Sequence, residues 1–299
     1  MCYHGILLKY LRKDDSLMQI WILFVFLYGI LKGFREIVKK KALERSSLME
    51  VLFFYTFIGF LFVLPDAKTA MQLTLPMIGY ICIKSFIIFI AWILGFTAIQ
   101  KMSVSLYSVL DLSMVIFSTA FGLLILKEHM TISRSIGLLL VLTGLILVNL
   151  RGSEKTEKAE PKYIAFVIIA SLLNAASALM DKILMKEITS SQLQFWFMFL
   201  MSLMYLAYLI AAKVTIHWNR LKKNYWIFIL GIMSVLGDRV LFMANAIPDS
   251  KITIMTLIKQ CSCIITIIIG KFVFKERDIG YKLLCAGIVI AGIAIALIW

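Results

Sequence analysis

Asp111 and Lys259 are ionisable residues of opposite charge that stand inside long apolar runs, 148 positions apart. An ionisable group inside a membrane helix costs roughly 2.5–3.5 kcal/mol on insertion scales, so it normally faces protein or a water-filled cavity. Two interpretations remain open. The pair lines the wall of a central cavity, or it forms a salt bridge that joins two central helices. The two interpretations are compatible if a substrate competes with each residue of the pair for binding to the other.

Basic residues recur at helical spacing near the end of the first apolar run. Lys32, Arg35 and Lys39 fall on one face of a helix, because residues three and four apart are neighbours there. Lys32 and Arg35 either bind an anionic group or extend their charged ends to the membrane surface. For Lys39 and the two lysines after it we favour the surface interpretation. Glu36 can neutralise one of these cations.

Other polar and aromatic residues within apolar runs are candidates for the same cavity. Lys84 is either a binding residue or the partner of Asp111 or Asp238. Asp238 and Arg239 are neighbours in sequence and point about 100° apart on a helix, so they need separate partners. The predicted cavity residues are Lys32, Arg35, Lys84, Trp92, Tyr107, Asp111, Asn174, Asp238, Arg239 and Lys259.

An internal repeat with an offset of 148 positions runs through the chain. Its matched positions are Asp111 and Lys259, Gly122 and Gly270, Lys127-Glu128 and Lys275-Glu276, and Gly144 and Gly292. Small residues four apart let helix backbones approach closely. We therefore predict helix packing at Gly29, Gly33, Ser118, Gly122, Thr266 and Gly270.

The elements that must position these residues are membrane-spanning helices. Of the 299 residues, 62% are hydrophobic and only 16% are charged, and the mean hydropathy is +0.94. A soluble domain is about a quarter charged. The apolar runs are continuous rather than alternating, which favours helices over a barrel. The predicted spans are 18–38, 50–65, 76–99, 104–126, 132–150, 162–182, 193–212, 224–246, 252–274 and 281–299.

We predict an all-α integral membrane protein whose ten transmembrane helices form two inverted five-helix repeats. The first repeat covers residues 18–150, a polar linker covers 151–162, and the second repeat covers 163–299. Because five is odd, the second repeat enters the membrane in the opposite orientation, and the two repeats share a central site. The first 17 residues are either a short cytosolic arm or a segment upstream of a start at Met18.

The ends of the fourth and ninth spans resemble the EamA-like family of the drug/metabolite transporter superfamily. The shared pattern is a long apolar helix, a Glu, a short polar turn and a Gly-spaced final helix. The residues that carry it are Gly122 to Glu128, Thr131, Gly137 and Gly144 in one copy, and Gly270 to Glu276, Gly280 and Gly292 in the other. The resemblance covers about residues 19–299. It implies transport of a small metabolite and places both termini in the cytosol.

These features predict a secondary transporter that moves a small polar metabolite through a central cavity by alternating access, without ATP. Basic residues outnumber acidic ones in the middle of the spans, which favours an anionic or zwitterionic metabolite. The alternative is a flippase for a lipid or a lipid-linked metabolite, with a lateral opening in the same fold. An integral-membrane enzyme is less favoured, because the sequence has no paired His-Glu helix motif and no Gly-flanked Ser elbow.

The predicted partners are a small-molecule metabolite and the lipid bilayer. The net charge of +14 comes mainly from short loops, as membrane topology requires, so we expect no nucleic-acid partner. Cysteines and histidines form no cluster with ligand spacing, so we expect neither a metal nor a cofactor. Proton coupling would need a carboxylate that changes its protonation state, and Asp111, Asp181 and Asp238 are the candidates.

Ten spans place both termini on the same side of a cell membrane. The loops on the side opposite the N-terminus carry more basic residues, and the positive-inside rule then puts the N-terminus outside. The family resemblance implies cytosolic termini instead. We follow the resemblance, because it extends over nearly the whole chain.

Overall fold

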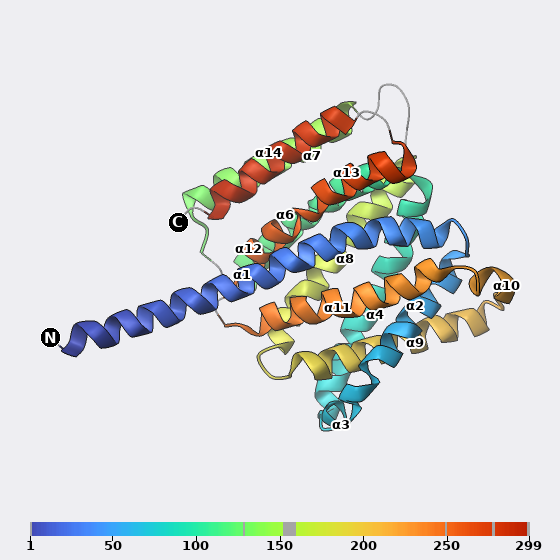
Figure 1. The fold of residues 1–299 in the computed structure, drawn as a ribbon, viewed down its shortest axis with the longest axis horizontal. Helices are drawn as coiled ribbons and strands as arrows, with labels where there is room; N and C mark the ends of the chain where they lie inside the picture. Colours follow the sequence, from blue (N-terminus) through green and yellow to red (C-terminus); the bar gives the residue numbers. More distant parts are fainter. Residues whose placement is uncertain (1, 128, 152–159, 249, 277–278, 298–299) are drawn as a thin grey trace.

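The computed structural model describes residues 2–127, 129–151, 160–248, 250–276 and 279–297, without the side chains of residues 2–19, 145, 146, 148–151, 253, 293 and 297. Helix is the only regular secondary structure of the described residues, which confirms the predicted all-α class. The helices are α1 (Cys2–Leu43), α2 (Leu48–Val63), α3 (Ala67–Ala70), α4 (Leu75–Lys101), α5 (Val104–Leu110), α6 (Met114–Leu124), α7 (Ile132–Arg151), α8 (Pro161–Leu184), α9 (Ser190–Ala211), α10 (Trp218–Leu221), α11 (Tyr225–Ala246), α12 (Ile252–Lys259), α13 (Ser262–Phe274) and α14 (Ile279–Leu297), with 3-10 turns η1 (Leu64–Asp66) and η2 (Asp111–Ser113) (Figure 1).

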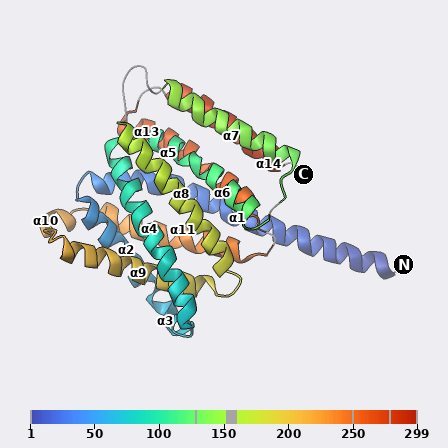
Figure 2. The same cartoon turned by 180° about the vertical axis from the view of Figure 1, so that it is seen from behind.

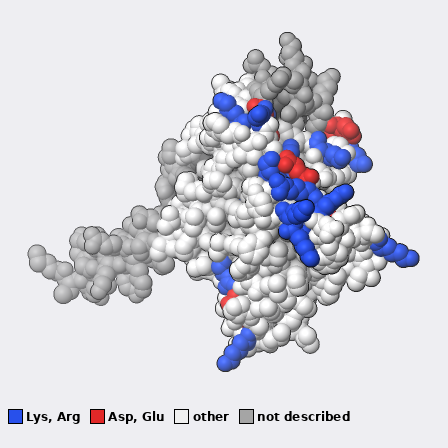
Figure 3. Space-filling view, turned by 45° about the vertical axis from the view of Figure 1, so that its right-hand side comes forward, with Lys and Arg blue, Asp and Glu red and all other residues white. Residues whose placement is uncertain are grey.

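Eight stretches of the described residues are long and apolar enough to cross a membrane. A further stretch, Ile132–Gly144 in α7, is a shorter apolar helix. Much of the molecular surface in Figure 3 is uncharged, and the Lys and Arg side chains gather in a few clusters. The predicted multi-pass membrane protein is confirmed, whereas the number of ten spans stays a prediction.

Helices from the two parts of the chain pack against each other in pairs. α1 lies along α11, α8 lies along α4, α2 lies along α9, and α7 lies along α14 (Figures 1 and 2). Each of these pairs joins a helix that precedes the predicted linker to one that follows it. The two parts are therefore interleaved, and residues far apart in sequence meet between them.

Two of the membrane-crossing stretches are interrupted near their middle. Helix α5 ends at Leu110, and η2 follows before α6 begins at Met114. Helix α12 ends at Lys259, and α13 begins at Ser262. The interruptions therefore fall at Asp111 and Lys259, the pair that the repeat offset singled out. A tighter turn in the middle of a helix often marks a functional hinge.

The ends of the same two stretches also match. Lys127 and Lys275 both adopt a left-handed backbone conformation, with φ of 54° and 55°. This conformation costs a non-glycine residue roughly 1–2 kcal/mol. Its recurrence at the repeat offset shows that both copies turn in the same way. Glu128, which follows Lys127 in the repeat motif, lies outside the described residues.

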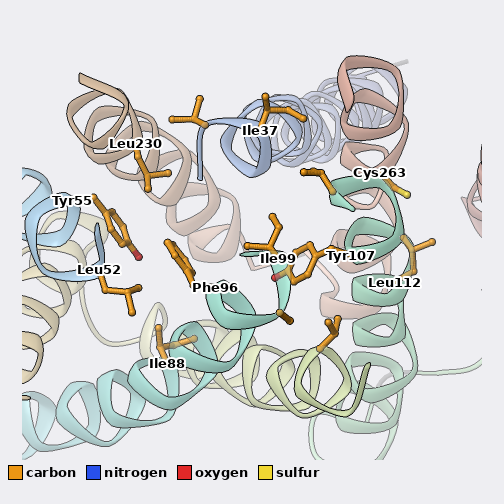
Figure 4. Close-up of a cluster of buried hydrophobic side chains, with 14 of the residues drawn as sticks. Ile37, Leu52, Tyr55, Ile88, Phe96, Ile99, Tyr107, Leu112, Leu230 and Cys263 are labelled. Carbon is orange, nitrogen blue, oxygen red and sulfur yellow. The ribbon is translucent and has the colours of Figure 1, made fainter. Parts of the chain in front are cut away.

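A large apolar cluster holds the interleaved helices together. Figure 4 shows Tyr55 of α2, Phe96 and Ile99 of α4, and Tyr107 of α5 converging on one region of the interior. The rings of Tyr55 and Phe96 stack with centroids 5.6 Å apart. Each of these four side chains is at least 95% buried. The cluster therefore packs α2, α4 and α5 against one another in the interior.

Glycines let α1 approach the interrupted stretch closely. A Cβ atom added at Gly33 would lie 2.7 Å from the Cβ atom of Ile265 and 2.9 Å from the carbonyl oxygen of Ser262. One added at Gly29 would lie 3.3 Å from the carbonyl oxygen of Lys259. The Thr266 hydroxyl donates a hydrogen bond to the carbonyl of Gly33 at 3.2 Å.

The remaining positions of the predicted packing set are also enclosed. Ser118 and Gly122 are buried on α6, and Gly270 is buried on α13. A Cβ atom added at Gly270 would lie 3.2 Å from the Ser105 hydroxyl oxygen. Small side chains at these positions leave room for the neighbouring helices.

Replacement of Gly33 by leucine should lower the melting temperature of the purified protein. The added side chain meets the backbone of α13, and overpacking of this kind costs roughly 1–3 kcal/mol. Gly79→Leu on α4 is the matched control, because an added Cβ there meets nothing within 4 Å. Equal melting temperatures for the two variants would contradict the close approach of α1 and α13.

Candidate functional site

A cavity of about 110 Å³ lies between the interleaved helices. Its walls come from α1, α4, α5, η2, α6, α8, α9, α11 and α12, so both parts of the chain contribute. Nine of the ten predicted cavity residues line it, namely Lys32, Arg35, Lys84, Trp92, Tyr107, Asp111, Asn174, Asp238 and Lys259. Their role in binding a substrate stays a prediction.

Lys32 and Asp111 form the first buried ion pair of the cavity. The Lys32 Nζ atom donates to the Asp111 Oδ2 atom at 2.6 Å, and each side chain is about 10% exposed. The Ser171 hydroxyl donates to the other carboxylate oxygen at 3.3 Å. Lys32 therefore neutralises Asp111, rather than extending to the membrane surface. The predicted alternative of a salt bridge between Asp111 and Lys259 is not the pairing that the structure has.

Arg35 and Asp238 form a second pair, which joins α1 to α11. The Arg35 Nη1 atom donates to the Asp238 Oδ1 atom at 3.1 Å, and Nη2 donates to the Tyr28 hydroxyl at 3.2 Å. The Asp238 Oδ2 atom is buried and has no hydrogen-bond partner among the described residues. One oxygen of this carboxylate is thus held in place while the other remains able to accept a hydrogen bond.

Lys84 pairs with a different carboxylate from the two that the sequence analysis considered. Its Nζ atom lies 3.2 Å from the Asp181 Oδ1 atom, and the Lys84 side chain is only 2% exposed. The same Nζ atom lies 3.7 Å from the ring centroid of Phe197. A cation over an aromatic face is attracted to the ring electrons. The prediction of Asp111 or Asp238 as the partner was wrong, because α8 rather than η2 or α11 brings its carboxylate to Lys84.

Lys39 is buried at the cavity, so the surface interpretation was wrong for this lysine. Its Nζ atom lies 2.7 Å from the Glu36 Oε2 atom. It also lies 4.6 Å from the ring centroid of Phe96. Lys41, in contrast, is partly exposed and pairs with the exposed Glu44 at the end of the helix. Because Lys39 and Lys41 are two residues apart, they lie on nearly opposite sides of the helix, one facing the interior and the other the surface.

Lys259 is the fifth basic residue that lines the cavity. It is 4% exposed, and its side chain makes no hydrogen bond or ion pair with any residue that the structure describes. It stands at the end of α12, where the membrane-crossing stretch is interrupted. Its position differs in this respect from the four other cavity cations, each of which contacts a carboxylate.

Arg239 is the one predicted cavity residue that lies elsewhere. It donates hydrogen bonds to Asp66 of η1 and to Ser191 and Gln194 of α9. It therefore ties α11 to two neighbouring elements and does not line the cavity. The 100° between Asp238 and Arg239 sends the first toward α1 and the second toward α9.

Glu276 has a structural role that the sequence analysis treated only as part of a motif. Its carboxylate accepts hydrogen bonds from the backbone N–H groups of Val104 and Ser105, at 2.8 and 3.2 Å, and from the Ser105 hydroxyl. It therefore joins the end of α13 to the start of α5. The repetition of the Lys-Glu pair at the offset of 148 was the signal for this position.

No group of three or more His, Cys, Asp or Glu residues in the described part of the chain has the arrangement of a metal site. The described cysteines Cys82, Cys261, Cys263 and Cys285 are not joined in disulfides. The polar chemistry at the cavity is therefore that of ammonium, guanidinium, carboxylate, hydroxyl and amide groups.

The comparisons with known proteins identify the family. A model of the EamA-like transporter family matches the chain twice, over residues 19–150 and 161–298. The chain belongs to this family of transporters, which is part of the drug/metabolite transporter superfamily. It is therefore a membrane transporter of the drug/metabolite type.

The fold has counterparts among solved structures. One of them, titled "Crystal structure of protein", has a TM-score of 0.68 and 10% sequence identity, and the match covers 93% of this chain and 97% of that one. At this identity the likeness concerns the fold alone. A comparison with curated proteins finds no match.

Replacement of Lys32 by methionine should destabilise the protein. It leaves Asp111 as an uncompensated buried charge, a loss that typically costs about 3–5 kcal/mol. The double variant Lys32→Met with Asp111→Leu should regain most of that free energy of unfolding. Lys41→Met is the control, because loss of an exposed pair costs at most about 1 kcal/mol. Chemical denaturation in detergent micelles measures these differences, and a double variant no more stable than Lys32→Met would refute the pairing.

Proposed function

We propose that the chain is a secondary transporter of a small polar metabolite that is anionic or zwitterionic. The substrate occupies the central cavity, and the protein exposes that cavity alternately to the two sides of the membrane without ATP hydrolysis. The observation that carries the proposal is the cavity itself. It is lined by basic and acidic side chains from both parts of the chain, at the point where two membrane-crossing stretches are interrupted.

The charged lining supports a transport site over a purely structural core. Buried ionisable groups in a membrane are costly and tend to mark substrate or ion pathways. Interrupted helices near the middle of the bilayer are also common at the binding sites of secondary transporters. The volume is small compared with the roughly 300–1,000 Å³ of sites for drug-sized ligands. It favours a small metabolite over the lipid of a flippase.

The proposed architecture is ten transmembrane helices in two inverted repeats, over residues 18–150 and 163–299, joined by the linker 151–162. The packing of α1 on α11 and of α8 on α4 supports it. In each pair, the first helix of one part of the chain packs against a later helix of the other part, as a two-fold relation between the parts requires. The left-handed residues Lys127 and Lys275 support it as well. We place the protein in the cell membrane with both termini in the cytosol, as the family resemblance implies.

Movement between the two open states requires contacts that break and re-form at the ends of the cavity. The Arg239 contacts with Asp66 and α9 and the Glu276 contacts with α5 lie on different elements and join helices of both repeats. Both sets of contacts are suited to break and re-form, because they involve charged groups that can form hydrogen bonds with water instead. Proton coupling through Asp111, Asp181 or Asp238 is compatible with this arrangement.

Filling the cavity should abolish transport without unfolding the protein. The test starts with a thermal-shift screen of metabolites on the purified protein, and each stabilising compound is then used in counterflow uptake by proteoliposomes. Ala178→Trp places a large ring at a position that lines the cavity. We expect at least a tenfold loss of uptake for this variant.

Ala176→Trp is the matched control, because it lies two residues away on the same helix, about 200° around its axis. Uptake by this variant should remain near that of the unmodified protein. If no stabilising compound enters sealed vesicles, or if the vesicles instead scramble a fluorescent lipid, the proposed transport of a soluble metabolite is incorrect.

A further inference from the structure

The charges around the cavity do not balance. Its described lining contains five basic residues and four acidic residues. The basic residues are Lys32, Arg35, Lys39, Lys84 and Lys259, and the acidic ones are Glu36, Asp111, Asp181 and Asp238. With every group ionised, one positive charge is left over.

The surplus charge is located on Lys259. The other four cations contact carboxylates at 2.6 to 3.2 Å, so each acid of the lining is already used. Lys259 is enclosed to 96% and makes no such contact with the described residues. An isolated ammonium group in a medium of low polarity is unfavourable, so a binding partner of opposite charge stabilises it.

The surroundings of Lys259 fix its place in the cavity. Charged groups face it from α1, as Lys32 and Arg35, from η2, as Asp111, and from α8, as Asp181. The two carboxylates among them are held by Lys32 and Lys84. Helix α1 presses on the backbone at this point, because Gly29 would place a Cβ atom only 3.4 Å from the Cα atom of Lys259. Helix α12, which carries Lys259, therefore cannot move away from the cavity without disturbing α1.

We infer that the ammonium group of Lys259 binds one singly charged acid group of the transported molecule, such as a carboxylate. A single negative charge restores neutrality in the cavity, whereas a doubly charged phosphate would leave one negative charge without a partner. The four ion pairs remain intact when such a group binds, so they hold the walls while Lys259 holds the ligand. This assignment rests on the proposed transport function.

The asymmetry of the repeat gives the subsite a direction. The matched position in the first repeat is Asp111, which is already neutralised by Lys32 and held by Ser171. The acid group therefore binds on the α12 side of the cavity rather than at an equivalent place on the α5 side. The Asp238 Oδ2 atom, which lacks a hydrogen-bond partner among the described residues, offers an acceptor to an N–H or O–H group elsewhere on the same ligand.

The first test needs no ligand. Lys259→Met removes a buried charge that has no partner, so this variant should melt at a higher temperature than the unmodified protein in the absence of added solutes. Lys32→Met, which breaks a pair, should melt at a lower temperature. A lowered melting temperature for Lys259→Met would overturn the inference, because it would mean that Lys259 is held by contacts within the protein.

The second test uses a panel of defined probes on the purified protein. Small monocarboxylates, among them acetate, lactate and pyruvate, are each paired with the corresponding primary amide, and succinate and inorganic phosphate are included as dianions. At least one monocarboxylate should bind more tightly than its amide and more tightly than the dianions. Lys259→Met should weaken that binding at least tenfold, and Lys259→Arg should restore it.

Lys271→Ala is the control, because this lysine is exposed on the adjacent helix α13 and should leave binding unchanged. Binding of amides or dianions as tight as that of the monocarboxylates, or unchanged affinity in Lys259→Met, would overturn the subsite. Absence of any monocarboxylate among the ligands would overturn it as well. The transport function is judged separately, because it fails only if no ligand of the unmodified protein crosses sealed proteoliposomes.

Discussion

A charge that is enclosed within a membrane protein must find a partner, and this requirement organises the centre of the molecule. Four ion pairs stand around the cavity, and two of them, Arg35 with Asp238 and Lys84 with Asp181, join the two parts of the chain. Each of these two pairs fixes the distance between two helices, whereas Lys39 with Glu36 lies within α1. The geometry of the cavity therefore depends on electrostatic pairing as much as on apolar packing.

The apolar contacts set how closely the helices that carry these charges can approach. Gly33 brings α1 against α13, and the cluster around Tyr55 and Phe96 encloses the neighbouring interior. The ion pairs then form in a volume from which lipid is excluded. Because the membrane-crossing stretches of α5–α6 and α12–α13 are interrupted at Asp111 and Lys259, the same site combines charge with local freedom of the backbone.

Much of this arrangement could be predicted from the sequence. Continuous apolar runs gave the helical class, and the cost of a charge in such a run singled out most of the residues that line the cavity. The repeat offset pointed to Asp111 and Lys259, because it aligns the two copies in sequence and requires no knowledge of which residues are neighbours in space. Glycines at helical spacing likewise indicated where helices approach.

The choice of partners could not be predicted, because it depends on how the helices rotate and tilt when they pack. Lys84 was expected near Asp111 or Asp238, yet α8 places Asp181 beside it. Arg239 is adjacent to a cavity residue in sequence and still points to α9. Lys39 is close to the end of the hydrophobic run, and only the neighbouring helices show that its turn is enclosed.

The most direct measurement is a double-mutant cycle across the pair that joins α1 to α11. The free energy of unfolding in mixed micelles is measured for Arg35→Met, Asp238→Leu, the double variant and the unmodified protein. If pairing of buried charges holds the cavity together, each single variant is strongly destabilised. The loss of unfolding free energy in the double variant is then smaller than the sum of the two single losses by roughly 0.5–3 kcal/mol. Additive losses, with no coupling between the two side chains, would contradict the account.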